Sequence, residues 1–294
     1  PVRIFVMGGG DGRKNKYGRL NHGGYWRDEN EWPIPKFKPT LLYLHPDYSL
    51  RPEPSKERNS STTYTFDPND PAPTIGGNIS ALSSIRPVPN YIGDPSVLPM
   101  IVRTQPIVAN GGWDQRERKD VFGAKPPYNA PLNARSDILT FETLPLDRDV
   151  EVTGHLEVKL WVSSNVPDTD FTAKLIDVYP SNVDYPDGYA LNISDSIFRM
   201  RYRDSWEKPK MMETGQTYAV TITLYPTSNL FATGHKIRLD ISSSNFPRFD
   251  INPNTGEPLG RNTHTRVASN TVHHSADSQS HVVLSLSPSS FAHA

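Results

Sequence analysis

The stretch His155-Leu156-Glu157-Val158-Lys159-Leu160-Trp161-Val162 places an aliphatic side chain at every second position. Successive side chains of a β-strand point to opposite faces of the sheet, so the four aliphatic residues share one buried face. Residues 236–241 repeat this pattern, with three aliphatic residues separated by charged ones. Both segments are therefore predicted to be strands that line a hydrophobic core.

The same period of two recurs in residues 198–203, 217–224 and 282–286, and residues 1–7 are predicted to be a further strand with both faces partly apolar. Helical periodicity of any length is missing, and 28 of the 294 residues are prolines, which favour turns. We therefore predict an all-β fold, a two-sheet sandwich such as a jelly roll, with a barrel as the alternative. Residues 8–32 and 76–136 lack a strand pattern and are predicted to be long irregular loops.

Composition excludes several classes of function. The chain has 31 basic and 32 acidic residues, a balance that differs from the basic surface of nucleic-acid-binding proteins. No run approaches the roughly 18 consecutive apolar residues of a membrane-spanning helix. Zero cysteines exclude a thiolate nucleophile and a cysteine-based zinc site, and leave the cellular compartment undecided. The chain starts at Pro1 rather than at methionine, which suggests a processed chain or a piece of a longer one.

Candidate catalytic and metal-binding residues were sought by type and spacing. No Gly-x-Ser-x-Gly elbow occurs, and Ser242-Ser243-Ser244 lies too close along one strand to His235 and Asp240 for a triad to converge. The histidine-rich segment 273–281 lacks metal-ligand spacing and is interpreted as a solvated loop. A calcium loop at Asp168, Asp170 and Asp177 would lack the expected glycine and terminal glutamate. We predict neither a catalytic residue nor a metal site.

One alternative function arises from aromatic side chains. Tryptophans can stack on sugar rings, so a carbohydrate-binding β-sandwich is the alternative interpretation, with a platform built from Trp26, Trp32, Trp113 and Trp161.

Seven ordered motifs resemble those of one family. They are Asp114-Gln115-Arg116, Val152-Thr153-Gly154-His155, Pro167 to Leu175, Phe198 to Arg203, Thr227 to Phe231, Gly234 to Arg238, and Ser243 to Arg248. Together they resemble the C-terminal domain of the Xaa-Pro dipeptidyl-peptidase and cocaine-esterase-like serine hydrolases, a group with α-amino-acid ester hydrolases and glutaryl acylases. The opening residues 2–8, with Trp26 to Glu29 and Glu31 to Pro33, resemble the junction that follows the catalytic domain in this family.

The resemblance implies a domain organisation. Residues 1–35 would be a junction strand and loop that follow a missing α/β-hydrolase domain, and residues 36–294 a jelly-roll, galactose-binding-like β-sandwich with a loop excursion over 76–136. The family's serine, acid and histidine lie upstream of the matched segment, so the chain alone is expected to be inactive. No cofactor is implied. The chain would be the accessory sandwich of an ester, amide or Xaa-Pro hydrolase.

The resemblance also implies partners and site residues. The partners are the α/β-hydrolase domain of the same polypeptide and a small ester or amide substrate at the domain interface, and a homo-oligomer is left open. Residues 78–113 would approach the substrate, with Asn78, Ile79 and Trp113 adjacent to it. An apolar docking patch is expected from Val2, Ile4, Val6, Trp26, Trp32 and the 78–113 loop.

Other motif residues are assigned structural roles, and these are Asp114, Arg116, Asp168, Asp170, Arg199, Arg201, His235 and Asn245. Three arginines on one strand face would repel one another, so we expect some of Arg199, Arg201 and Arg203 to meet carboxylates such as Asp168, Asp170 or Asp177. Asp170 in particular is predicted to be buried and paired.

Overall fold

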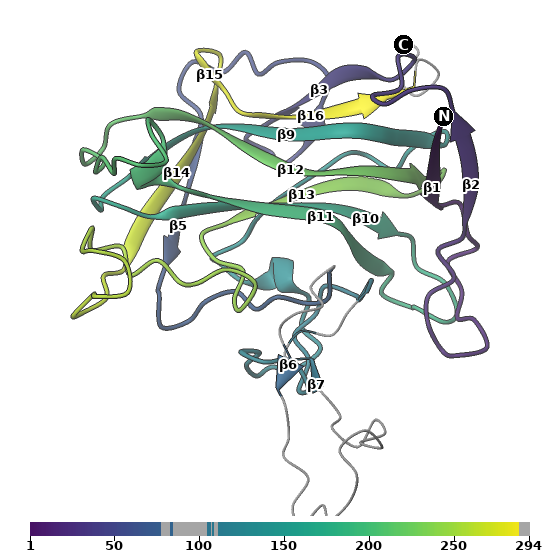
Figure 1. The fold of residues 1–294 in the computed structure, drawn as a ribbon, viewed down its shortest axis with the longest axis horizontal. Helices are drawn as coiled ribbons and strands as arrows, with labels where there is room; N and C mark the ends of the chain where they lie inside the picture. The colour runs from purple at the N-terminus through teal and green to yellow at the C-terminus, as the bar shows by residue number, and fades with distance from the viewer. Residues whose placement is uncertain (78–82, 85–104, 107, 109–110, 288–294) are drawn as a thin grey trace, which may run out of the picture.

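The computed structural model describes residues 1–77, 83–84, 105–106, 108 and 111–287 (Figure 1). Over these ranges the protein is built from β-strands, and its helical content is limited to two 3₁₀ turns, η2 (Leu132–Ala134) and η3 (Met200–Tyr202). The described part of the chain holds no helix long and apolar enough to cross a membrane.

Two sheets pack face to face. The first follows the order β2-β1-β12-β9-β16-β3-β4, and β14 joins β5 and β15 to it through β9. Its strands are β1 (Val2–Gly8), β2 (Gly24–Glu29), β3 (Lys38–Leu44), β4 (Leu50–Arg51), β5 (Ser61–Phe66), β9 (Val150–Ser164), β12 (Tyr218–Phe231), β14 (Ala268–Ser275), β15 (Ser278–Gln279) and β16 (His281–Leu286).

The second sheet has the order β11-β10-β13-β8. Its strands are β8 (Leu139–Glu142), β10 (Asp170–Tyr179), β11 (Tyr189–Arg199) and β13 (Lys236–Ser242), and a separate two-stranded ladder pairs β6 (Ser83–Ser84) with β7 (Gln105–Pro106). The core between the two sheets receives the aliphatic face of β9, including Val158, and that of β13, including Leu239. The all-β sandwich predicted from the period-two pattern is therefore confirmed.

Three sequence-based predictions of local structure were wrong. The strand expected over 198–203 ends at Arg199, and the chain turns into η3, so the three arginines do not share a strand face. The loop expected over 8–32 contains β2, whose exposed edge position hides any alternation between buried and exposed side chains. His273 and His274 lie within β14 rather than in a solvated loop, and His274 is buried.

The described parts of the excursion over 76–136 cover the outer side of the second sheet. In Figure 1 the segment around η2 lies on the far side of β10, β11 and β13 from the first sheet. The Gln115 side chain donates to the Ile75 carbonyl at 2.9 Å, and Ser242 Oγ donates to the Asp137 carbonyl at 2.8 Å. Ile75, Leu132 and Ile138 form a small apolar cluster of their own. This cover explains why β10 and β13 are buried on both faces.

The patch expected at the N-terminal end differs from the prediction. Val6 is fully buried within the sandwich, and Val2, Ile4 and Trp32 are half-buried. Phe5 and its cross-strand partner Trp26 are exposed because they lie on the opposite face of the sheet from Val6. Tyr25 shares the face of its partner Val6 and is exposed because β2 is the edge strand.

Candidate functional site

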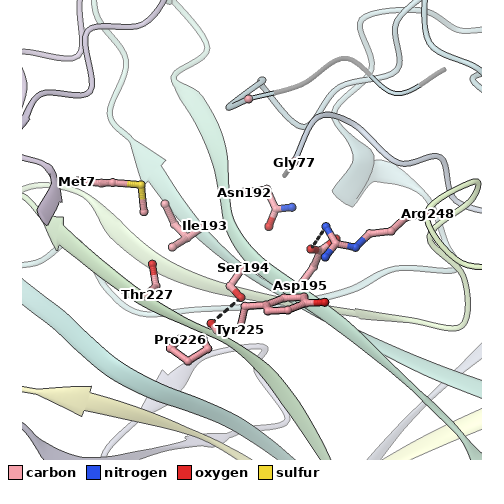
Figure 2. A pocket seen from close by; sticks show the side chains of 11 residues that line it. Met7, Gly77, Asn192, Ile193, Ser194, Asp195, Tyr225, Pro226, Thr227 and Arg248 are labelled. Atoms are coloured by element: carbon pink, nitrogen blue, oxygen red, sulfur yellow. Dashed lines mark hydrogen bonds and ion pairs between the residues drawn. The ribbon is translucent and has the colours of Figure 1, made fainter. Parts of the chain in front are cut away.

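A cavity of about 520 Å³ opens at the edge of the sandwich where β11 and β12 approach one another (Figure 2). Both strands carry a β-bulge there. The pairing of β10 with β11 leaves Ile193 without a partner, and the pairing of β12 with β9 skips Tyr225 and Pro226. Bulges redirect side chains and open the backbone, which is how two regular strands come to form a hollow. Met7 of β1 forms part of the same wall.

The cavity is lined by polar groups with defined partners. Ser194 Oγ donates to the Tyr225 carbonyl at 3.0 Å, and Arg248 forms a buried ion pair with Asp195 at 2.8 Å. Asn245 Nδ2 donates to the same carboxylate at 2.7 Å. Asn192 Oδ1 is buried and accepts no hydrogen bond from the described residues. This oxygen is an acceptor that a ligand or a neighbouring domain can satisfy.

Two glycines close one side of the cavity. Gly77 and Gly111 exchange backbone hydrogen bonds of 2.9 Å in each direction, and both have positive φ angles, of 121° and 96°. They flank the segment 78–110, so this segment begins and ends at the cavity. The predicted substrate-adjacent residues Asn78 and Ile79 lie outside the described residues. Trp113 is described and lines a different cavity.

A layer of buried charges continues from Asp195 across the outer face of the second sheet. Arg238 binds Asp240 through two hydrogen bonds of 2.7 and 2.6 Å. Burial lowers the pKa of Lys174 below its usual range, and the carboxylates of Asp195 and Asp240 oppose that change. This layer fixes the outer side chains of β10 and β13 beneath the excursion.

The acidic motif around Asp168 and Asp170 makes a second buried network, where β10 begins and β11 ends. Arg199 Nη2 binds Asp170 at 2.8 Å, Arg201 Nε binds Asp168 at 2.7 Å, and Asn252 donates to both carboxylates. Burial is the largest influence on Asp170 and raises its pKa to about 6. Two arginines thus meet carboxylates as expected, whereas Arg203 donates to backbone carbonyls.

The other motif residues also make local contacts. Asp114 accepts from Arg116 Nε at 2.7 Å and from the Ala190 amide at 3.0 Å, which ties the excursion to β11. His235 Nδ1 lies 2.8 Å from Asp177, and burial raises the pKa of that carboxyl. These residues connect elements and do not line the cavity of Figure 2.

Among the described residues, no histidine bonds a hydroxyl group through one ring nitrogen and a carboxylate through the other, as a nucleophilic relay requires. Ser60 and Ser163 are hydrogen-bonded to His274 and His273, but neither histidine bonds a carboxylate within the described residues. His235 bonds Asp177 and no hydroxyl among these residues. The three strand-end serines have structural partners, which are the Asp137 carbonyl for Ser242, Tyr64 and Asn270 for Ser243, and the Ala72 amide for Ser244.

The tryptophans of the alternative sugar platform lie on separate elements. Trp26 packs on Phe5 at the sheet edge, Trp32 lies against His155, Trp161 belongs to β9, and Trp113 belongs to the excursion. No ring contact in the described part of the chain joins two of these four residues.

Sequence reasoning missed the residues of the cavity in Figure 2, notably Asn192, Asp195 and Tyr225. One signal was present, because Pro226 interrupts a strand pattern and a proline inside a strand marks a bulge or an edge. The partner bulge in β11 has no such marker.

Comparison with known proteins identifies the family of the chain. Residues 1–283 match the family model described as X-Pro dipeptidyl-peptidase C-terminal non-catalytic domain. Cocaine esterase from Rhodococcus sp. (strain MB1 Bresler) is 34% identical over 293 residues, which cover 96% of this chain and 41% of that protein. The chain therefore spans about two fifths of this relative's length.

Solved structures agree in fold. An aminopeptidase from a marine sediment Thaumarchaeota archaeon superposes with a TM-score of 0.68 at 25% identity, over 89% of this chain and 38% of that one. An α-amino acid ester hydrolase superposes with a TM-score of 0.67 at 27% identity, over 89% and 39% of the two chains. The chain belongs to the family of C-terminal non-catalytic domains of X-Pro dipeptidyl-peptidase and cocaine-esterase-type hydrolases.

Proposed function

We propose that this domain packs against an α/β-hydrolase catalytic domain of the same polypeptide and helps to shape its substrate pocket. The main support for this proposal is the cavity at the sandwich edge, where the pairing of Gly77 with Gly111 brings both ends of the segment 78–110 together. The reaction in this proposal is the hydrolysis of a small ester or amide through an acyl-enzyme formed on the catalytic domain.

The side chains around the cavity support binding rather than bond cleavage. Asn192 Oδ1 offers an acceptor, and Arg248 carries a charge that Asp195 neutralises. Ser194 already donates its hydroxyl hydrogen to a backbone carbonyl and has no base among the described residues. Tyr225 is 59% exposed beside these groups and presents an apolar ring with a polar end, a combination common at interfaces.

The first test is an activity assay. The 294-residue chain is expected to hydrolyse neither p-nitrophenyl esters nor Xaa-Pro anilides above background and to remain unlabelled by a serine-reactive phosphonate. The whole polypeptide that contains it is expected to hydrolyse these substrates and to be labelled by the phosphonate. Stoichiometric labelling of a serine in the chain alone would place the chemistry here and contradict the proposal.

The second test addresses pocket shaping in the whole polypeptide. Tyr225→Ala is expected to raise KM about tenfold while kcat changes little, since it removes binding that substrate and transition state share. Trp206→Ala is the control, because Trp206 is also a large aromatic residue, 76% exposed, in a loop that does not line the cavity. Equal kinetics for the two variants would rule out a role for this edge.

A further inference from the structure

A second cavity, of about 200 Å³, shares no residue with the first. Three segments far apart in sequence meet there, which are the turn within residues 13–20, residues 112–118 of the excursion, and the connection between β10 and β11. Figure 1 shows the loop between β1 and β2 beside that connection, and Arg13 Nε binds Asp184 at 2.6 Å across the contact. The volume is below the roughly 300–1,000 Å³ of drug-sized ligand sites, so it suits a molecule of one ring.

Aromatic side chains form the walls of this second cavity. Trp113, Tyr185 and Tyr189 line it, and the two tyrosine rings contact edge to face with centroids 4.9 Å apart. Their positions are held by the backbone around them. Asn182 Oδ1 accepts a hydrogen bond from the Tyr185 amide at 3.1 Å, and Asn182 Nδ2 donates one to the Gly12 carbonyl at 3.0 Å. The walls are therefore assembled before any ligand arrives, which lowers the entropy lost on binding.

Positive charge gathers at the same place. The Arg118 guanidinium lies 4.1 Å from the centre of the Trp113 ring, and Arg19 lies 5.8 Å from the same ring. Arg118 binds the exposed Asp120, whereas Arg19 has no ion pair with any described carboxylate. Lys14 adds a third cation, 5.2 Å from the Tyr185 ring.

The carboxylate in the lining does not oppose an anion. Asp114 uses one oxygen for Arg116 at 2.7 Å and the other for the Ala190 amide at 3.0 Å. Its charge is therefore neutralised within the wall. Among the described residues that line the cavity, the charged group without an ion pair is the exposed guanidinium of Arg19.

We propose that this cavity binds a small aromatic carboxylate. A guanidinium group pairs with a carboxylate through parallel hydrogen bonds, and aromatic walls stack on a planar ring. A neutral sugar would leave the exposed Arg19 guanidinium paired only with water, and an aliphatic acid would leave the aromatic walls uncovered. The inference does not depend on the proposed packing against a catalytic domain.

Calorimetric titration of the 294-residue chain with benzoate tests the proposal. We expect saturable binding, weakened by salt, and at least about tenfold weaker binding of benzyl alcohol, acetate and methyl β-glucoside, which lack the charge, the ring or both. Arg19→Gln is expected to weaken benzoate binding about tenfold, since a hydrogen bond to a charged group is lost. Lys16→Gln is the matched control, a cation of the same turn that does not line the cavity and is expected to leave the affinity unchanged.

Several results would overturn the proposal. They are the absence of saturable benzoate binding, equal binding of benzyl alcohol or acetate, preference for the glucoside, and equal affinities of the Arg19→Gln and Lys16→Gln variants. Each readout is binding to this chain itself, so failure here is distinguishable from failure of the domain-packing proposal, whose readouts are kinetic.

Discussion

At the scale of single residues, the buried carboxylates of the motif around Asp168 and Asp170 lie in partnered sets. Asp168 and Asp170 are fully buried, and each has its own arginine and shares Asn252 with the other. Taking a carboxylate out of water costs several kcal/mol, and the paired guanidinium offsets that cost only when the geometry is complete. Removal of one partner therefore lowers the free energy of unfolding by much more than the intact pair contributes to it.

Asp170→Ala is expected to lower the free energy of unfolding by about 3 kcal/mol, because Arg199 loses its buried partner. Urea denaturation measures the change. Asp28→Ala is the control, since Asp28 pairs with Arg3 at 3.3 Å on the surface, where both side chains are about 70% exposed, and a loss under about 0.5 kcal/mol is expected. Similar losses for both variants would show that burial does not set the strength of the Asp170 pair.

Stability is also expected to depend on pH through buried histidines. Burial lowers the pKa of His274 to about 4, against 6.5 for an unperturbed histidine, and lowers that of His273 and His281 as well. Between these two pH values the unfolded chain binds a proton that the folded chain does not, so the free energy of unfolding falls as pH drops from about 6.5 towards 4. Asp170 acts in the opposite direction, because its raised pKa lets the folded state take up a proton below about pH 6.

His274→Gln isolates the histidine contribution. Between neutral pH and pH 4.5, the free energy of unfolding of the variant is expected to fall by about 2 kcal/mol less than that of the parent. Thermal unfolding at a series of pH values measures this difference. His155→Gln serves as the control and should keep the parent's pH profile, because His155 is exposed and forms no ion pair among the described residues. An unchanged profile in the His274 variant would assign the acid sensitivity to other groups.

At the scale of elements, β1 depends on an unusually close backbone contact. It pairs in parallel with β12 and antiparallel with β2, and through β12 it joins the wall of the first cavity. Gly8 ends this strand with a φ of 89°, and a Cβ there would collide with the Leu230 carbonyl oxygen. Only glycine lets the two backbones approach this closely.

Gly8→Ala is therefore expected to separate the end of β1 from β12 and to speed amide hydrogen exchange throughout β1 and β2. Gly18→Ala is the matched control, because Gly18 has a similar φ of 70° with no atom near the added Cβ. The control should show only the small cost of the left-handed conformation, on the order of 1 kcal/mol. Equal effects of the two changes would mean that strain, and not the contact with Leu230, constrains Gly8.

At the scale of the whole molecule, the outer side chains around β1 leave apolar surface exposed. Trp26 is 63% exposed and Phe5 38%, and the two rings contact edge to face at 5.2 Å. Tyr225 adds a third exposed ring at the edge of the first cavity. Large exposed apolar patches on soluble domains mark interaction sites.

The isolated chain is accordingly expected to bind the dye ANS and to self-associate at high concentration, whereas the whole polypeptide should do neither. Light scattering and dye fluorescence measure this. Replacing Phe5 and Trp26 together by serine should reduce both signals, and Trp206→Ser should not, although Trp206 is the more exposed tryptophan. A monodisperse parent chain without excess dye binding would contradict the expectation that another domain covers this face of β1 in the whole polypeptide.

The sequence by itself determined the all-β class, the position of strands such as β9 and β13, and the family, because period-two alternation and ordered motifs are local properties of the chain. It did not determine the end of β11 at Arg199, where polar residues fit a strand or a turn equally well. Only the tertiary structure determined where the two candidate cavities lie and which residues line them. The first cavity exists because bulges at Ile193 and at Tyr225 to Pro226 come together from two sheets, and the second because Arg19, Trp113 and Tyr185 meet from three separate segments. Such meetings depend on strand register and long-range packing, which no local pattern records.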